Sequence, residues 1–211
     1  MLVTGTEDLE HTHACLAVLV KQKFHVACVD ASVYLKDVVQ DDTIKKRFEM
    51  ADLNRLTPEE FVQVIGPVFE HSPWIAGEAA AWRPFTTLLQ LHSALCETVR
   101  TASEEKQLAL IRAHPDLVGR AVLTAESQRE QADAGLGQLS PEEIALFQRY
   151  NAAYRGKFGF PFVICARLNK KDAILAGFAR RMPHSREEEV AAALEEIFKI
   201  AWLRLRDLVQ F

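Results

Sequence analysis

The fold of this chain is decided by a helix start that occurs twice, as Thr57-Pro58-Glu59-Glu60 and as Ser140-Pro141-Glu142-Glu143. Each start places a hydroxyl side chain at the N-cap, proline at the first helical position and glutamate at the third, which together satisfy N–H groups of a first helical turn. Behind each start the apolar residues recur every three or four positions, as on the buried face of a helix. These residues are Phe61, Val64, Ile65, Val68 and Phe69 behind the first start, and Ile144, Phe147, Tyr150, Tyr154 and Phe158 behind the second.

Helical periodicity continues on both sides of these two starts. The further helices that it predicts cover residues 73–82, 84–99, 103–113 and 185–211, with Ser103 and Ser185 as caps. Residues 50–211 are therefore predicted to form one all-α domain of roughly eight helices joined by short links.

Composition narrows the class of protein. The chain has 211 residues, 25 Lys and Arg against 29 Asp and Glu, a net charge of -4 and 49% hydrophobic residues, which is ordinary for a globular protein. A negative net charge gives no general attraction for nucleic acid or for an anionic membrane. We therefore expect a small-molecule or protein partner, no nucleic acid and no membrane.

The four cysteines are scattered and form no C-x-x-C pair, so the sequence shows no sign of a disulfide framework or a zinc ribbon. This pattern indicates a reducing compartment. The longest apolar stretch near the start, residues 15–20, is far shorter than the roughly 20 residues that span a bilayer, and acidic residues precede it. We expect a cytoplasmic protein. The cysteines are Cys15, Cys28, Cys96 and Cys165.

Three segments interrupt the helical pattern with features that a plain helical bundle does not need. In the first, Ala113-His-Pro-Asp-Leu117, a helix must end before the proline, which leaves His114 at its C-terminal end. That position holds an imidazole rigidly, as a catalytic or binding group. The alternative is a structural histidine that caps the helix or packs in the core.

The second segment is a short polar helix in which Ser127, Glu130 and Gln131 share one face, so that three hydrogen-bonding groups converge. The alternative is a solvated helix face that ends at Gly135.

The third segment is the apolar run Phe158–Arg167. It is either a buried strand or the start of a buried helix, and periodicity does not distinguish the two. Arg167 at its end is available to an anion, or it simply reaches solvent from a core segment.

Taken in order, these segments resemble the 2-oxo-4-hydroxy-4-carboxy-5-ureidoimidazoline (OHCU) decarboxylase family. Each motif is short, whereas the whole series, from about Leu53 to Val209, is specific. The family converts OHCU to (S)-allantoin in the last step of urate breakdown, so the resemblance implies a carboxy-lyase. The motifs are Phe69-Glu-His-Ser-Pro-Trp74, Ala113-His-Pro-Asp-Leu117, Ser127-x-x-Glu-Gln131 with Ala134-Gly-Leu136, Asn151-Ala-Ala-Tyr154 and Phe158-Gly-Phe-Pro-Phe-Val-Ile164.

The resemblance also implies residue roles. His114 is the expected proton donor, and Glu130 either orients the imidazole or binds the ureido group of the substrate, with both roles open. Arg167 is expected to pair with the substrate carboxylate, to hold the departing geometry or to bind the ring oxygen, with its role open. No metal and no organic cofactor is implied, because the imidazoline ring of the substrate can take up the electrons that carbon dioxide leaves behind. The expected substrate-binding residues are Pro115, Ser127, Gln131, Phe162, Val163, Ile164, Cys165, Ala166 and Arg167.

The family resemblance further implies a homodimer that receives its substrate through urate oxidase and 5-hydroxyisourate hydrolase. Two other readings stay open: a helical interaction module without activity, and a different lyase or hydrolase on the same scaffold. The presence of His114, Glu130 and Gln131 argues against the first.

Residues 1–49 match nothing in the resemblance and are interpreted as an N-terminal extension. The stretch from Phe24 to Leu35 has the β-branched and aromatic residues of a short strand, and His11, His13 and Cys15 form a weak metal-binding pattern with no further ligands nearby. The extension is a genuine appendage, a fusion remnant or part of an over-extended gene model. We prefer the last, because Met50 is placed like a natural start for this family.

Overall fold

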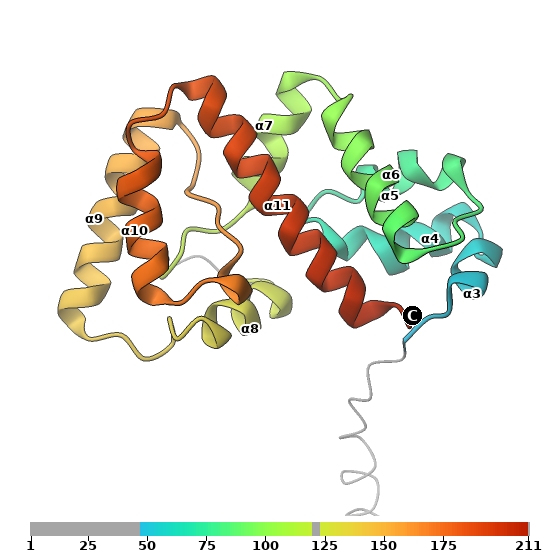
Figure 1. Cartoon of the computed structure of the whole chain (residues 1–211), viewed down its shortest axis with the longest axis horizontal. Coiled ribbons are helices and arrows are strands. Elements are labelled where there is room, and N and C mark those ends of the chain that lie inside the picture. Colours follow the sequence, from blue (N-terminus) through green and yellow to red (C-terminus); the bar gives the residue numbers. More distant parts are fainter. Residues whose placement is uncertain (1–46, 120–122, 211) are drawn as a thin grey trace, which may run out of the picture. The chain divides into compact units, whose positions relative to one another are not determined.

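The computed structural model of the chain describes residues 47–119 and 123–210, and its architecture follows from how the helices start (Figure 1). Nine α-helices and three 3-10 turns form within these residues, so the predicted all-α fold is confirmed. The helices are α3 (Met50–Arg55), α4 (Pro58–Ile65), α5 (Trp74–Ala79), α6 (Leu88–Arg100), α7 (Glu104–Ala113), α8 (Ala125–Asp133), α9 (Pro141–Phe158), α10 (Lys171–Arg181) and α11 (Arg186–Leu208). The 3-10 turns are η2 (Gly66–Val68), η3 (Ala80–Trp82) and η4 (Ala166–Leu168).

Both predicted capping boxes form. The side chain of Glu60 accepts the N–H of Thr57 at 2.8 Å while Thr57 caps the N–H of Glu60, and Ser140 and Glu143 repeat the arrangement before α9. Each reciprocal pair fixes a helix start through residues three positions apart, which is why the sequence predicted both starts.

The helix predicted from Pro84 begins later, at Leu88. Asn54 holds the preceding link extended, because its side-chain amide donates to the carbonyl of Phe85 at 2.7 Å and accepts the N–H of Phe85 at 2.8 Å. Thr87 then becomes the N-cap in place of a residue before Pro84. A contact across 31 positions has overridden the local signal.

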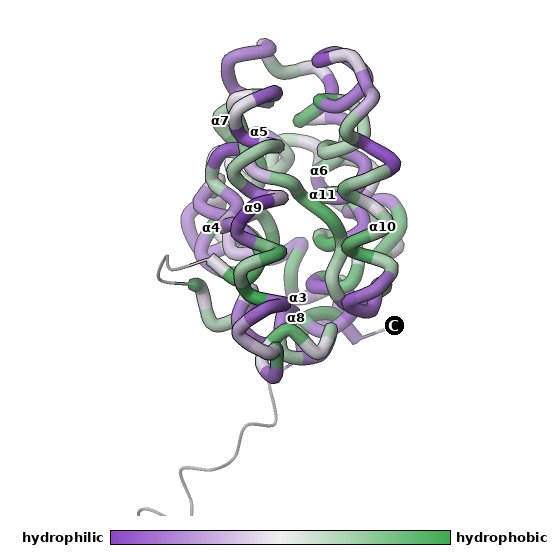
Figure 2. Tube along the Cα trace, turned by 90° about the vertical axis from the view of Figure 1, so that its left-hand side faces the viewer, coloured by the Kyte–Doolittle hydropathy of each residue, from purple (hydrophilic) through white to green (hydrophobic). Residues whose placement is uncertain are grey.

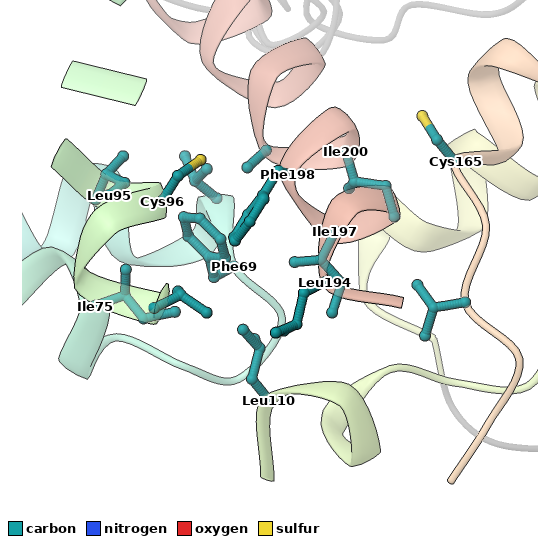
Figure 3. Close-up of a cluster of buried hydrophobic side chains, with 14 of the residues drawn as sticks. Phe69, Ile75, Leu95, Cys96, Leu110, Cys165, Leu194, Ile197, Phe198 and Ile200 are labelled. Carbon is teal, nitrogen blue, oxygen red and sulfur yellow. The ribbon is translucent and has the colours of Figure 1, made fainter. Parts of the chain in front are cut away.

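Helix α11 is at the centre of the packing. Figure 1 shows it running between a group formed by α4 to α7 and a group formed by α8 to α10. In Figure 3, Phe198 points toward Phe69 and Cys96, while Ile200 lies on the side toward Cys165. The helices alternate hydrophobic and hydrophilic stretches along their length in Figure 2, as expected for helices that bury one face. The helix therefore packs against α6 and α7 and turns Ile200 to the side of Cys165.

The apolar run after α9 is neither a strand nor a helix until it reaches η4. Residues 160–165 are buried and non-helical, and no ladder partner pairs with them among the described residues. Side chains take the place of that partner. Arg181 donates to the carbonyl of Val163 at 2.6 Å, and Glu196 accepts the N–H of Cys165 at 2.8 Å. We call residues 160–165 the extended segment.

The chain just before α3 pairs with the C-terminal end. Phe48 and Val209 form a parallel bridge, in which the N–H of Phe48 donates to the carbonyl of Leu208 and the N–H of Gln210 donates to the carbonyl of Phe48, both at 2.9 Å. The strand predicted over 24–35 and the pattern at His11, His13 and Cys15 lie outside the described residues. Across 47–119 and 123–210, no helix combines the length and the apolar character that crossing a membrane requires.

Gly177 marks a close approach between α10 and the extended segment. A Cβ added at Gly177 would lie 3.1 Å from Cζ of Phe162, whose ring is held against Phe178 with centroids 3.9 Å apart. Overpacking costs about 1–3 kcal/mol, whereas alanine gains about 1 kcal/mol of helix propensity over glycine. We expect Gly177→Ala to lower the free energy of unfolding by about 1 kcal/mol in urea titrations.

The matched control is Gly156→Ala in α9, where nothing lies within 4 Å of the added Cβ. This variant is expected to be more stable than the wild type by about 0.5–1 kcal/mol. Stabilisation of the same size at both positions would contradict the close packing of Gly177.

Candidate active site

A small cavity lies where the end of α7, the helices α8 and α11 and the extended segment meet. Both polar and apolar side chains face it. The lining consists of His114, Pro115, Leu117, Ser127, Glu130, Gln131, Phe162, Val163, Ile164, Ala166, Ile200 and Arg204.

The cavity brings together all the predicted site residues except Cys165 and Arg167. Arg167 is turned to Asp207 of α11, with Nη1 and Oδ2 2.6 Å apart, and that contact uses the charge expected to receive an anion. Cys165 contributes its N–H to Glu196, and burial raises the pKa of its thiol to about 11. The thiol is therefore protonated near neutral pH and is a poor nucleophile.

His114 ends α7 and faces the cavity. Its Nδ1 lies 2.9 Å from the carbonyl oxygen of Leu110. A carbonyl oxygen can only accept, so Nδ1 carries the hydrogen, and the neutral ring has its lone pair on Nε2. The same side chain thus caps the helix and lines the cavity, so a structural role for His114 does not exclude a role as a catalytic or binding group.

Burial lowers the pKa of His114 to about 4, although the hydrogen bond to Leu110 and the charge of Glu70 act in the opposite direction. The imidazole is consequently neutral near pH 7 in the unliganded protein. In this state Nε2 accepts a proton and has none to donate.

Arg204 is the main site residue that sequence reasoning missed. Its Nε and Nη2 donate to the two oxygens of Glu130 at 2.9 and 2.8 Å, and its Nη1 donates to Glu70 at 3.0 Å. The Arg204 side chain is only 6% exposed, so the guanidinium has exchanged water for two carboxylates. The only feature of the sequence that could have indicated Arg204 is its position, because a charged residue stands there on the apolar face of α11.

Glu70 anchors this cluster from behind the cavity. Its carboxylate accepts from Thr124 at 2.8 Å, from Ser127 at 3.1 Å and from Arg204. Burial raises the pKa of Glu70, but the Thr124 hydrogen bond and the Arg204 charge outweigh it and hold the pKa below its usual range. Glu70 is therefore a fixed negative charge next to Ser127 and Arg204.

The loop that follows His114 is held by two of the motif residues. Asn151 donates to the carbonyl of Leu117 at 2.7 Å, and the side chain of Gln131 accepts the N–H of Val118 at 3.1 Å. Val118 has a φ of +56°, a left-handed conformation that is strained for a β-branched residue. Gln131 thus stabilises an unfavourable backbone at the edge of the cavity.

These features define a class of protein: an all-α scaffold whose small cavity combines a neutral imidazole with a guanidinium that two carboxylates share, a combination suited to acid–base chemistry on a small anionic molecule. The model of the OHCU decarboxylase family matches residues 54–206. The chain belongs to the OHCU decarboxylase family.

Three similar proteins illustrate this membership. The chain is 46% identical over 158 residues to the 2-oxo-4-hydroxy-4-carboxy-5-ureidoimidazoline decarboxylase of Haloferax volcanii, covering 75% of this chain and 94% of the relative. It is 40% identical to the uric acid degradation bifunctional protein PucL of Bacillus subtilis, covering 77% of this chain and 33% of that protein. A crystal structure of (S)-allantoin synthase superposes with a TM-score of 0.62 at 31% identity, covering 77% of this chain and 54% of the other.

The buried imidazole predicts that stability falls at acid pH. A histidine titrates near 6.5 in an unfolded chain and His114 near 4 in the folded one, so the unfolded state binds more protons between these values. The contribution of His114 to the free energy of unfolding should therefore fall by on the order of 2–3 kcal/mol as the pH drops from about 6.5 to about 4.

Urea titrations at several pH values check this contribution. The variant His114→Gln lacks the titrating group, so its free energy of unfolding should fall less steeply than that of the wild type over the same window. Parallel curves would contradict a neutral, buried His114.

Proposed function

We propose that this chain converts OHCU to (S)-allantoin as a carboxy-lyase, with His114 handling the proton. One observation carries the proposal: the imidazole, with its lone pair on Nε2, shares a cavity with the buried guanidinium of Arg204. Membership of the OHCU decarboxylase family and the names of the relatives support the choice of substrate.

The reaction requires that one group of the protein take up a proton from the substrate and return one to it. Carbon dioxide leaves from the ring carbon that also bears the hydroxyl. The electron pair of the broken C–C bond forms a double bond to the neighbouring ureido-bearing carbon. The imine nitrogen attached to that carbon receives the displaced electrons and takes up a proton. The hydroxyl then becomes a carbonyl by losing its proton, and the ureido-bearing carbon gains one. Nε2 of His114 can accept the first of these two protons and return one to the carbon from a single face, which gives one enantiomer.

Arg204 replaces Arg167 in our proposal as the partner of the substrate carboxylate. Too strong a pairing would stabilise the ground state and slow the loss of carbon dioxide. Glu70 prevents this, because its bond to Nη1 of Arg204 leaves only part of the guanidinium for the substrate.

For Glu130, the geometry favours binding over orientation of the imidazole. The carbonyl of Leu110 already orients the ring of His114, whereas both oxygens of Glu130 lie on Arg204. A substrate carboxylate that reaches Arg204 displaces Glu130, whose oxygens then accept the N–H groups of the ureido arm.

The experiment that tests the proposal generates OHCU in place from urate with urate oxidase and 5-hydroxyisourate hydrolase, and follows the chiral signal of allantoin. The uncatalysed reaction is slow and gives a racemate, so rate and handedness both report on the protein. A rapid rise of (S)-allantoin is expected. Only the slow racemic reaction, with folded protein present, would overturn the proposal.

Removing the imidazole should abolish this conversion. General acid–base catalysis contributes about 10²–10⁴-fold, so we expect His114→Gln to lose at least about a hundredfold in kcat and to form racemic allantoin. The helical circular dichroism should match that of the wild type at pH 7, which serves as the folding control. Near-normal turnover by this variant would remove His114 from the mechanism.

We also propose that residues 50–211 carry the activity without the N-terminal extension. Two deletions test this, one of residues 1–45 and one of residues 1–49. Both should stay active, but only the second removes the two hydrogen bonds of Phe48 with the C-terminal end. The shorter chain should therefore melt at a lower temperature, and loss of activity in both deletions would contradict the proposal.

We also propose an oligomeric state, a location and a place in metabolism for this chain. We expect a cytoplasmic homodimer that works after urate oxidase and 5-hydroxyisourate hydrolase in purine metabolism. The exposed side chains of Trp82 and Leu89, at 55% and 62%, offer apolar surface for self-association. Sedimentation velocity of the wild type checks the oligomeric state.

A further inference from the structure

A second buried polar cluster lies outside the cavity, where α9, α10 and α11 meet. Its centre is Glu189, whose side chain is fully buried. One carboxylate oxygen accepts from Nε of Arg181 at 2.8 Å, from Nη2 of Arg181 and from the hydroxyl of Tyr154, and the other lies 2.8 Å from Nδ1 of His184. None of these four side chains lines the cavity.

Arg181 connects this cluster to the lining of the cavity. Its Nη1 donates to the carbonyl of Val163 at 2.6 Å, and its guanidinium lies over the ring of Phe162, 4.5 Å from the centroid. Val163 and Phe162 both face the cavity. A single side chain therefore touches two consecutive lining residues from behind.

Stability does not explain the cluster well. A buried ion pair is often no more stabilising than apolar residues of the same size. Burial works against both charges here, since it raises the pKa of Glu189 and lowers the pKa of Arg181. The donors of Arg181 and Tyr154 act in the opposite direction and hold Glu189 as a carboxylate. The surrounding space is already filled by aromatic rings, including Phe162, Phe178 and Tyr154.

The cluster does supply a directional constraint on the extended segment, through the bond from Arg181 to the carbonyl of Val163. Strands take their register from a ladder of backbone hydrogen bonds, and residues 160–165 have no ladder partner in the described parts of the chain. Three side chains act instead: Arg181 donates to the carbonyl of Val163, Glu196 accepts the N–H of Cys165, and Asn169 donates to the carbonyl of Cys165 at 2.9 Å. They bracket Ile164, the residue between them, which faces the cavity.

We propose that Arg181 is a positioning residue, which fixes the backbone of the extended segment through the Val163 carbonyl and the Phe162 ring, with Glu189 as its buried counter-charge. The inference rests on the proposed function, because the segment is expected to meet OHCU. It adds a determinant of substrate binding that touches no substrate and lies on α10.

The decisive variant removes both charges at once, as Arg181→Met with Glu189→Met. This double variant leaves no uncompensated buried charge, so it is expected to fold. KM for OHCU should rise at least about tenfold while kcat falls less, because the loosened segment binds the substrate poorly. Partial unfolding would instead lower the apparent kcat and leave KM unchanged. A folded double variant with wild-type KM would overturn the proposal.

Arg181→Lys is the second variant, in case the first does not fold. Lysine keeps the positive charge near Glu189 but has one nitrogen in place of three, so it cannot hold Glu189 and Val163 with the same geometry. KM should again rise. The matched control is Arg180→Lys on the neighbouring, exposed position of α10, which should behave as the wild type.

Amide hydrogen exchange gives a readout that does not depend on activity. In Arg181→Lys, exchange of the amides at residues 163–165 should become faster, whereas exchange in α6 should not change. Unchanged exchange in the segment would refute the positioning role. A wild type that fails to convert OHCU would overturn the proposed function, while faster exchange would still support the role of Arg181 in holding the segment.

Discussion

The cavity depends on three charged side chains that the central helix α11 directs inward. Glu189 is the counter-charge of Arg181, Glu196 holds the N–H of Cys165, and Arg204 binds Glu70 and Glu130. Their spacings of seven and eight positions correspond to about two helical turns each, so they share one face of the helix. Because the same helix packs against α6 and α7 in the core, the packing of the core also sets the positions of these charges.

Each of these charged side chains stands where a helical core normally has an apolar residue. Each is compensated by hydrogen bonds or ion pairs with nearby groups. Arg204 is paired twice, and Glu189 receives donors from three side chains. The strained Val118 is held by Gln131 in the same manner. Departures from ordinary packing thus concentrate around one cavity, which is where functional sites are expected to accept such costs.

His114 shows how burial selects a chemical role. In water the imidazole would be partly charged near neutral pH, but burial favours the neutral form and the Leu110 carbonyl fixes which nitrogen keeps the hydrogen. In the proposed reaction the ring therefore meets OHCU as an acceptor, and a proton that it later donates must first come from the substrate. This matches a reaction in which a hydroxyl proton has to leave and a carbon has to receive one.

The sequence by itself determined the helix starts, the all-α class and the short motifs around His114 and Glu130, because caps and helical faces depend on residues three or four positions apart. It did not reveal the later start of α6, the non-helical course of residues 160–165, or the choice of Arg204 over Arg167 at the cavity. Those features depend on contacts between distant parts of the chain, such as Arg204 with Glu130 across 74 positions. Only the tertiary structure decided them, since burial and pairing of a charge are properties of the assembled helices.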